Sequence, residues 1–266
     1  MKKLLITLML VNVSSATSFA ATNNLQMFNT LTFSEGSAFK SDNHKQILNS
    51  FIEYPLSNKM SIGAITQASR IDSEHNNGTN AYALNTAEIF HRYKLLSYKK
   101  LGVIMHNSYK FPSVYNENKN LGLMPKQADY EMRFLFAFNM KDRLVNTVAQ
   151  GDTPYFVRLE TAYRKKFSNP FDEVRFTFWG GYNLNSKFAL LVRDDITWNI
   201  QSKTNATSNS YSSFKTSKDA NNMATFSLMY RVSPNASLQA GYLRRLHGNA
   251  PFYENQGVVI GLWDSF

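Results

Sequence analysis

The chain contains no cysteine among its 266 residues. A disulfide framework, a thiolate metal site and a lipid-modified cysteine are therefore excluded. Long apolar runs are also missing, since the sequence has one short run and a mean hydropathy of -0.35. Each helix of a membrane bundle needs about 20 consecutive apolar residues. A protein built from several membrane helices is excluded as well.

Aromatic residues are abundant instead, at 14% of the chain, with 20 Phe, 14 Tyr and 3 Trp. So much apolar surface excludes an intrinsically disordered chain, which has few aromatic residues. Lys and Arg number 29 against 19 Asp and Glu, which gives a formal charge of +10. Composition therefore favours a folded, basic protein with many strands or a large aromatic core.

The first 20 residues have the pattern of an export signal. Lys2 and Lys3 precede an apolar stretch of about ten residues, and small residues surround the bond after Ala20. The apolar stretch is too short to cross about 30 Å of hydrocarbon, so we interpret residues 1–20 as a cleaved signal peptide. The mature chain, 21–266, then has 246 residues and a charge of +8.

Beyond residue 25 the dominant pattern is strict alternation of apolar and polar side chains. Tyr130, Met132 and Phe134, for example, alternate with Glu131 and Arg133. The pattern predicts an all-β fold, a single antiparallel up-and-down transmembrane β-barrel over residues 21–266. We expect twelve strands, with ten or fourteen as alternatives, at residues 25–36, 46–56, 60–72, 80–97, 100–112, 127–141, 154–167, 172–184, 186–200, 219–233, 236–247 and 254–266.

The lengths of the connections support a barrel with both termini in the periplasm. Connections after the second, fourth, eighth and tenth predicted strands are short, whereas those after the fifth and ninth are long and polar. Outer-membrane barrels have short periplasmic turns and longer outer loops. The segment 142–153 is a long connection where this rule predicts a short one. A large soluble β-sandwich remains an alternative, because it would bury the same apolar rows against a second sheet.

The C-terminal strand resembles the assembly signal of bacterial outer-membrane β-barrels. The chain ends on Phe266, preceded by Val258, Ile260 and Leu262 at alternate positions. Asp264 departs from the pattern, since an apolar residue is usual there. The resemblance implies recognition by the barrel assembly machinery and a place in the outer membrane of a Gram-negative bacterium, in contact with its lipid.

The stretch from Pro154 to Trp198 resembles poorly characterised proteobacterial barrels, some of which are grouped with transporters of the meta-pathway phenol-degradation type. It includes Arg158, Glu160 and the sequence Asp172-Glu173-Val174-Arg175. The resemblance covers about a fifth of the chain and implies an envelope barrel with a transport role.

Alternation also predicts which charged side chains converge inside the barrel. The expected interior set is Glu88, Arg92, Lys94, His106, Lys110, Glu131, Arg133, Arg158, Glu160, Arg164, Glu173, Arg175, Arg193, Asp195, Arg231 and Arg245. Guanidinium groups bind carboxylate and phosphate in a bidentate manner, so this set suits a passage for small anionic or polar solutes. The candidate solute-binding residues are Arg133, Arg158, Glu160, Arg164, Glu173, Arg175, Arg193, Asp195 and Arg231. The same residues can instead form a salt-bridged lining that closes a narrow barrel.

Three polar residues fall on rows predicted to face lipid: His91, Asp194 and Arg244. A bulge that turns Asp194 inward, or a place near the outer rim, would reconcile it with the membrane. His91 is the best candidate for a Ser–His pair of the kind used by twelve-stranded outer-membrane phospholipases.

Enzymatic and nucleic-acid functions have little support in the sequence. It contains no zinc-binding HExxH sequence, no GxSxG elbow and no phosphate-binding loop, so we expect no enzyme, metal or cofactor. Arg and Glu are interspersed rather than gathered into a basic stripe, which argues against a nucleic-acid partner.

Overall fold

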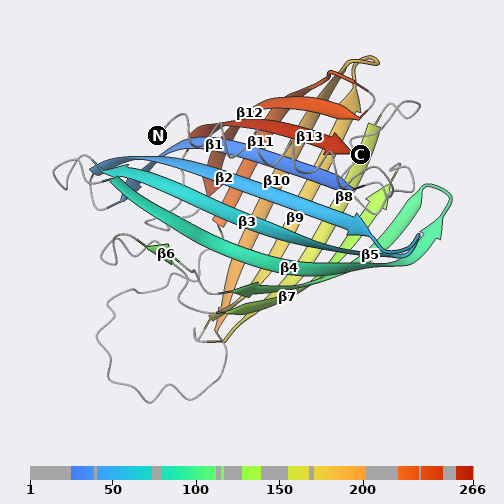
Figure 1. Ribbon diagram of the computed structural model, residues 1–266, viewed down its shortest axis with the longest axis horizontal. Helices are drawn as coiled ribbons and strands as arrows, with labels where there is room; N and C mark the ends of the chain where they lie inside the picture. Colours follow the sequence, from blue (N-terminus) through green and yellow to red (C-terminus); the bar gives the residue numbers. More distant parts are fainter. Residues whose placement is uncertain are drawn as a thin grey trace.

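The computed structural model describes residues 25–38, 41–73, 80–111, 115–116, 128–138, 155–167, 171–201, 221–233, 235–247 and 256–265. No helix within these ranges is long and apolar enough to cross a membrane. Their regular structure is β-strand (Figure 1): β1 (Gln26–Ala38), β2 (Ser41–Pro55), β3 (Met60–Ser73), β4 (Asn80–Tyr98), β5 (Leu101–Phe111), β6 (Tyr115–Asn116), β7 (Asp129–Phe138), β8 (Tyr155–Lys166), β9 (Phe171–Asn183), β10 (Phe188–Gln201), β11 (Asn221–Arg231), β12 (Ala236–His247) and β13 (Gln256–Ser265).

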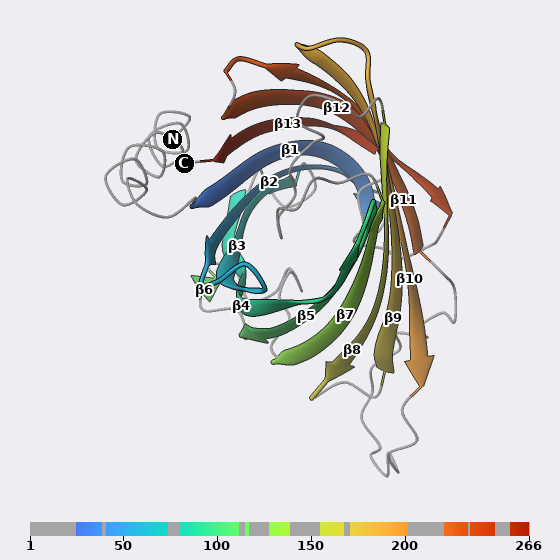
Figure 2. The ribbon, with the colours of Figure 1, turned by 90° about the vertical axis from the view of Figure 1, so that its right-hand side faces the viewer.

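The strands form one closed antiparallel barrel. Apart from the two-residue strand β6, which pairs beside β4, each strand is bonded to the strands that precede and follow it in the chain. β1 pairs with β13, from Gln26 opposite Ser265 to Glu35 opposite Gln256, and this pairing closes the ring. Figure 2 shows the strands surrounding a central space. The predicted up-and-down barrel of twelve long strands is confirmed.

Alternation along each strand separates an apolar outer wall from a polar interior. Along β7, for example, Tyr130 and Met132 are exposed on the outer wall while Glu131 between them is 2% exposed inside. Side chains in a strand alternate between faces, and residues paired across two strands point to the same face. The apolar outer wall and the polar interior therefore continue around all twelve long strands.

The two ends of the barrel differ in their connections. The first residue of β1 lies beside the last residue of β13, at the same end as the short connections β2–β3, β4–β5, β9–β10 and β11–β12. We call this the turn end, and the opposite end the loop end. The long connections after β5 and β10 leave from the loop end, as predicted. Phe138 and Tyr155 lie at the turn end, so the connection 139–154 belongs there despite its length.

The predicted strand boundaries agree with the structure to within a few residues, except at β2. This strand begins at Ser41 rather than at residue 46, because its first residues, Ser41-Asp42-Asn43-His44-Lys45, are polar on both faces and show no alternation. The proposed signal peptide and Phe266 lie outside the described residues.

Candidate functional site

Nine of the sixteen residues predicted to lie inside gather, together with Lys166, on one part of the wall, formed by β7, β8, β9 and β10. We call them the arginine–carboxylate ladder. Cross-strand register places Glu131 opposite Arg164, Arg164 opposite Glu173, and Arg158 opposite Trp179, which in turn lies opposite Arg193. The ladder consists of Glu131, Arg133, Arg158, Glu160, Arg164, Lys166, Glu173, Arg175, Arg193 and Asp195.

Glu131 is the centre of the ladder. Arg133 donates from Nε to its Oε1 at 2.9 Å, and Arg164 lies 2.7 Å from its Oε2. Arg175, two strands away from Glu131, reaches the same Oε2 at 3.4 Å. One carboxylate that is 2% exposed therefore holds three guanidinium groups. A buried charge is tolerated only when it is paired in this way.

Two further carboxylates continue the network in both directions along the wall. Toward the turn end, Glu160 binds Arg158 and Arg133, each at 2.5 Å. Toward the loop end, Glu173 binds Lys166 and lies 3.7 Å from Arg164. Since each carboxylate shares its cations with the next, the ladder crosses the strands as one network.

Within the ladder, Arg193 and Asp195 of β10 form a pair of their own. Nη2 of Arg193 donates to Oδ1 of Asp195 at 2.9 Å, and the hydroxyl of Thr177 donates to the same oxygen at 2.8 Å. The guanidinium groups of Arg158 and Arg193 lie 4.7 Å and 5.1 Å from the ring centroid of Trp179. At such distances a cation is attracted to the face of an indole ring.

The cations of the ladder differ in how far they are covered. The side chain of Arg158 is 9% exposed and that of Arg164 14%, whereas those of Arg175 and Arg193 are 30% and 42% exposed. With six cations and four carboxylates, the ladder carries an excess of two positive charges. Arg175 and Arg193 present the most accessible part of this positive charge to the interior.

Arg231 is the one candidate that the structure places away from the ladder. Its guanidinium donates to the Asn183 side chain at 2.6 Å and to the Ser186 carbonyl oxygen at 3.0 Å. These contacts hold the rim at the turn end, next to the β9–β10 connection.

A second charged group, on β2, β3, β4 and β5, lies next to the ladder along the wall, since His106 is opposite Arg133, and was only partly predicted. Arg92 binds Glu53 at 2.7 Å and donates from Nε to Nδ1 of His106 at 3.0 Å. The hydroxyl of Ser61 donates to Glu53, and both residues have an exposed fraction of 0%. The sequence predicted Arg92 and His106 inside but missed Glu53 and Ser61, because alternation is weak in their strands. Glu53 lies two residues after Phe51 and therefore on the same face of β2, and this spacing was the available signal.

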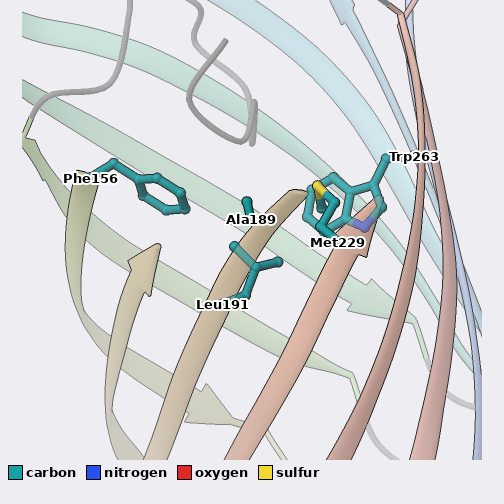
Figure 3. Close-up of a cluster of buried hydrophobic side chains, with 5 residues drawn as sticks. All are labelled: Phe156, Ala189, Leu191, Met229 and Trp263. Atoms are coloured by element: carbon teal, nitrogen blue, oxygen red, sulfur yellow. The ribbon is translucent and has the colours of Figure 1, made fainter. Parts of the chain in front are cut away.

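An aromatic layer crosses the interior in the half of the barrel near the turn end. Phe28 of β1 and Trp263 of β13 have ring centroids 3.9 Å apart, and Trp263 lies 6.2 Å from Trp179 of β9. Because three strands separate β9 from β13 in the wall, these two indoles meet across the interior. Figure 3 shows Trp263 beside Met229, together with Phe156, Ala189 and Leu191 of the same cluster. Phe28 also packs against Phe51 and its neighbours on the other side.

The three polar residues predicted on outward-facing rows all lie on the outer wall. Asp194 pairs with Phe178 and Ala224 in a register that is unbroken along β10, so no bulge turns it inward, and the residue faces outward in mid-strand. Arg244 faces outward three residues before the loop end of β12. The ring of His91 lies 3.1 Å from the amide nitrogen of Asn107, whose oxygen accepts from Tyr130 at 3.0 Å. Within the part of the chain that the structure describes, the side-chain partner of the candidate lipase histidine is thus an amide and not a serine.

Within the described residues, no group of three or more His, Asp or Glu side chains is arranged to hold a metal ion.

Comparisons with known proteins agree on the fold. No family model matches the sequence, and no curated protein matches it. An outer membrane channel from Pseudomonas putida F1 superposes with a TM-score of 0.66 at 12% identity, covering 92% of this chain and 96% of that one. The NanC porin superposes with a TM-score of 0.57 at 11% identity, covering 90% of this chain and 98% of the porin. The β domain of the Bordetella autotransporter Brka superposes with a TM-score of 0.51 at 9% identity, covering 92% of this chain and 100% of that domain. At such identities the likeness concerns the fold, and function depends on the site.

Proposed function

We propose that this chain is an outer-membrane β-barrel of a Gram-negative bacterium and forms a narrow channel for small anionic or polar solutes. The apolar outer wall suits contact with lipid on all sides, and solved barrels of similar fold include an outer membrane channel and a porin. The signal peptide and the strand ending at Phe266 would deliver the chain to the membrane and to the barrel assembly machinery.

The observation that carries the proposal is the partial exposure of Arg175 and Arg193 toward the interior. A guanidinium has five N–H donors, and among the described residues Arg175 and Arg193 each form an ion pair with a single carboxylate. Donors remain for a carboxylate or phosphate that enters from the loop end. Arg133, Arg158 and Arg164, which are more deeply paired, hold Glu131 and Glu160 in place.

The test is conductance across planar bilayers, with selectivity measured in a salt gradient. We expect the wild type to prefer anions and Arg175→Glu to shift the preference toward cations, because the substitution exchanges a positive charge in the passage for a negative one. Lys187→Glu is the matched control, since it makes the same change in charge at the exposed β9–β10 connection. Equal selectivity in all three proteins would contradict the proposal.

The location is tested separately by membrane fractionation and by gel mobility before and after boiling. A membrane barrel migrates differently when it is left folded. Recovery of a soluble, heat-insensitive protein would contradict the outer-membrane assignment itself.

A closed structural barrel is the second candidate, and the contact of Trp179 with Trp263 across the interior favours it. In that case the ladder stabilises the barrel wall, and neither the wild type nor Arg175→Glu conducts. Absence of conductance in the wild type, together with loss of folded protein in Arg175→Glu, would support this alternative.

A further inference from the structure

The outer wall carries an acid and a base at matching positions on two strands that flank a third. Asp194 of β10 lies opposite Ala224 of β11, and Ala224 lies opposite Arg244 of β12. Directly opposed residues in an antiparallel sheet point to the same face, so all three point outward. With neighbouring strands about 4.8 Å apart, the main chains at Asp194 and Arg244 are separated by about 10 Å.

Neither charge has a counter-ion among the described residues. Oδ1 of Asp194 is buried without a hydrogen-bond partner, and the side chain of Asn222 supplies the one hydrogen bond assigned to its carboxylate. Arg244 is exposed, and among the described residues no ion pair joins it to a carboxylate. Their surroundings are apolar, since Phe226 is 56% exposed and Phe178 39% exposed on the same wall. Uncompensated charges facing hydrocarbon are unfavourable, most of all in mid-strand as at Asp194.

We propose that the wall formed by β10, β11 and β12 is the interface of a two-fold symmetric dimer, in which Asp194 of each copy pairs with Arg244 of the other. A two-fold axis that runs along the membrane normal beside Ala224 sets β10 of one copy against β12 of the second. The dimer then contains two Asp194–Arg244 ion pairs, and both kinds of charged side chain are removed from contact with lipid. The inference rests on the proposed membrane location but not on transport.

The residues at the axis allow the two walls to approach. Ala224 is small, so no bulky side chain stands between Asp194 and Arg244 in this row of the outer wall. Small side chains at the contact are typical of close association between membrane segments. An apolar groove of about 290 Å³ reaches Asp194 from the β7–β9 side, and its lining includes Phe136, Leu159, Phe176, Phe178 and Ile196.

The first experiment uses the absence of cysteine from the chain. Phe226→Cys, on the outer row of β11 two residues from Ala224 and at a position that is 56% exposed, places one accessible thiol on each side of the axis, so a short bis-maleimide reagent should link two copies in phosphatidylethanolamine–phosphatidylglycerol vesicles. Ile89→Cys is the matched control, because Ile89 is 54% exposed on β4, away from the proposed interface. Cross-linking of the two variants to the same extent would overturn the proposal.

The second experiment reverses the charges. We expect Asp194→Arg and Arg244→Asp each to lower the dimer fraction about tenfold, as counted by single-molecule photobleaching, and the double variant to restore it. Arg244→Gln, which introduces no new charge, should also lower the fraction and serves if a reversed variant fails to fold. A wild type that remains monomeric would overturn the dimer, as would a double variant without recovery. Either result, obtained with a heat-modifiable membrane protein, leaves the proposed location intact.

Discussion

At Gly63 the barrel wall leaves no room for a side chain. A Cβ atom there would lie 2.3 Å from the carbonyl oxygen of Ile52 and 2.3 Å from Cζ of Phe90. The carbonyl oxygen belongs to the sheet and cannot move away, and Phe90 packs in the inner cluster. We expect Gly63→Ala to lower the free energy of unfolding by about 1–3 kcal/mol, the usual cost of overpacking. Urea unfolding of the barrel in lipid vesicles measures it.

Gly102 provides the control for this substitution. The nearest atom to a Cβ there is the carbonyl oxygen of Ala137 at 4.0 Å, which is ordinary contact. Gly102→Ala should change stability by less than about 0.5 kcal/mol. If the two alanine variants unfold at the same urea concentration, the explanation from close contact at Gly63 is wrong.

The facing of single residues was the most predictable property of this chain. Because the side-chain period of a strand is two, Glu131 and Arg133 inside and Tyr130 and Met132 outside follow from the sequence alone. The rule also placed Asp194 outside, and the expectation of a bulge came from the cost of a charge in lipid rather than from the pattern. The structure follows the pattern.

At the scale of the strands, the ladder on β7–β10 depends on one shared carboxylate. Removing the charge of Glu131 leaves Arg133, Arg164 and Arg175 with less compensation in a covered position. We expect Glu131→Gln to cost about 3 kcal/mol in the free energy of unfolding. The measurement is again urea unfolding, with the shift between unheated and boiled samples reporting the folded fraction.

Asp195→Asn is the comparison for Glu131→Gln, because the Arg193–Asp195 pair is the most exposed of the ladder, at 42% and 23% for the two side chains. Its loss should cost no more than about 1 kcal/mol, as for other solvated ion pairs. If Asp195→Asn lowered the free energy of unfolding more than Glu131→Gln does, the exposure of these ion pairs would not determine their contributions to stability.

Lateral contacts were harder to predict than strand positions. The sequence placed Glu131 and Arg175 on the inner face, but their contact spans two strand steps and depends on the stagger of the barrel. Glu53 and Ser61 escaped prediction for a related reason, since their strands alternate weakly and their partner Arg92 is distant in the chain. Local pattern determines facing, whereas register between strands determines partners.

For the whole molecule, closure of the ring produces a feature that no local pattern contains. Trp179 and Trp263 belong to strands that are not neighbours, and they meet because the wall curves back on itself. Their contact, extended by Phe28, divides the interior between the loop end and the turn end. If the barrel conducts, this aromatic layer is its narrowest point, and the ladder lines the approach from the loop end.

Substitution of the tryptophans tests that role, and the chain contains only three of them. We expect Trp179→Ala and Trp263→Ala each to raise single-channel conductance by about twofold, because a wider constriction offers less resistance. The preference for anions should persist, since Arg175 and Arg193 remain. Trp198, which is 37% exposed on the outer wall, is the matched control, and Trp198→Ala should conduct as the wild type does. Equal conductance in all four proteins would place the narrowest point elsewhere. A rise in Trp198→Ala alone would indicate that general loosening of the barrel, rather than the aromatic layer, controls conductance.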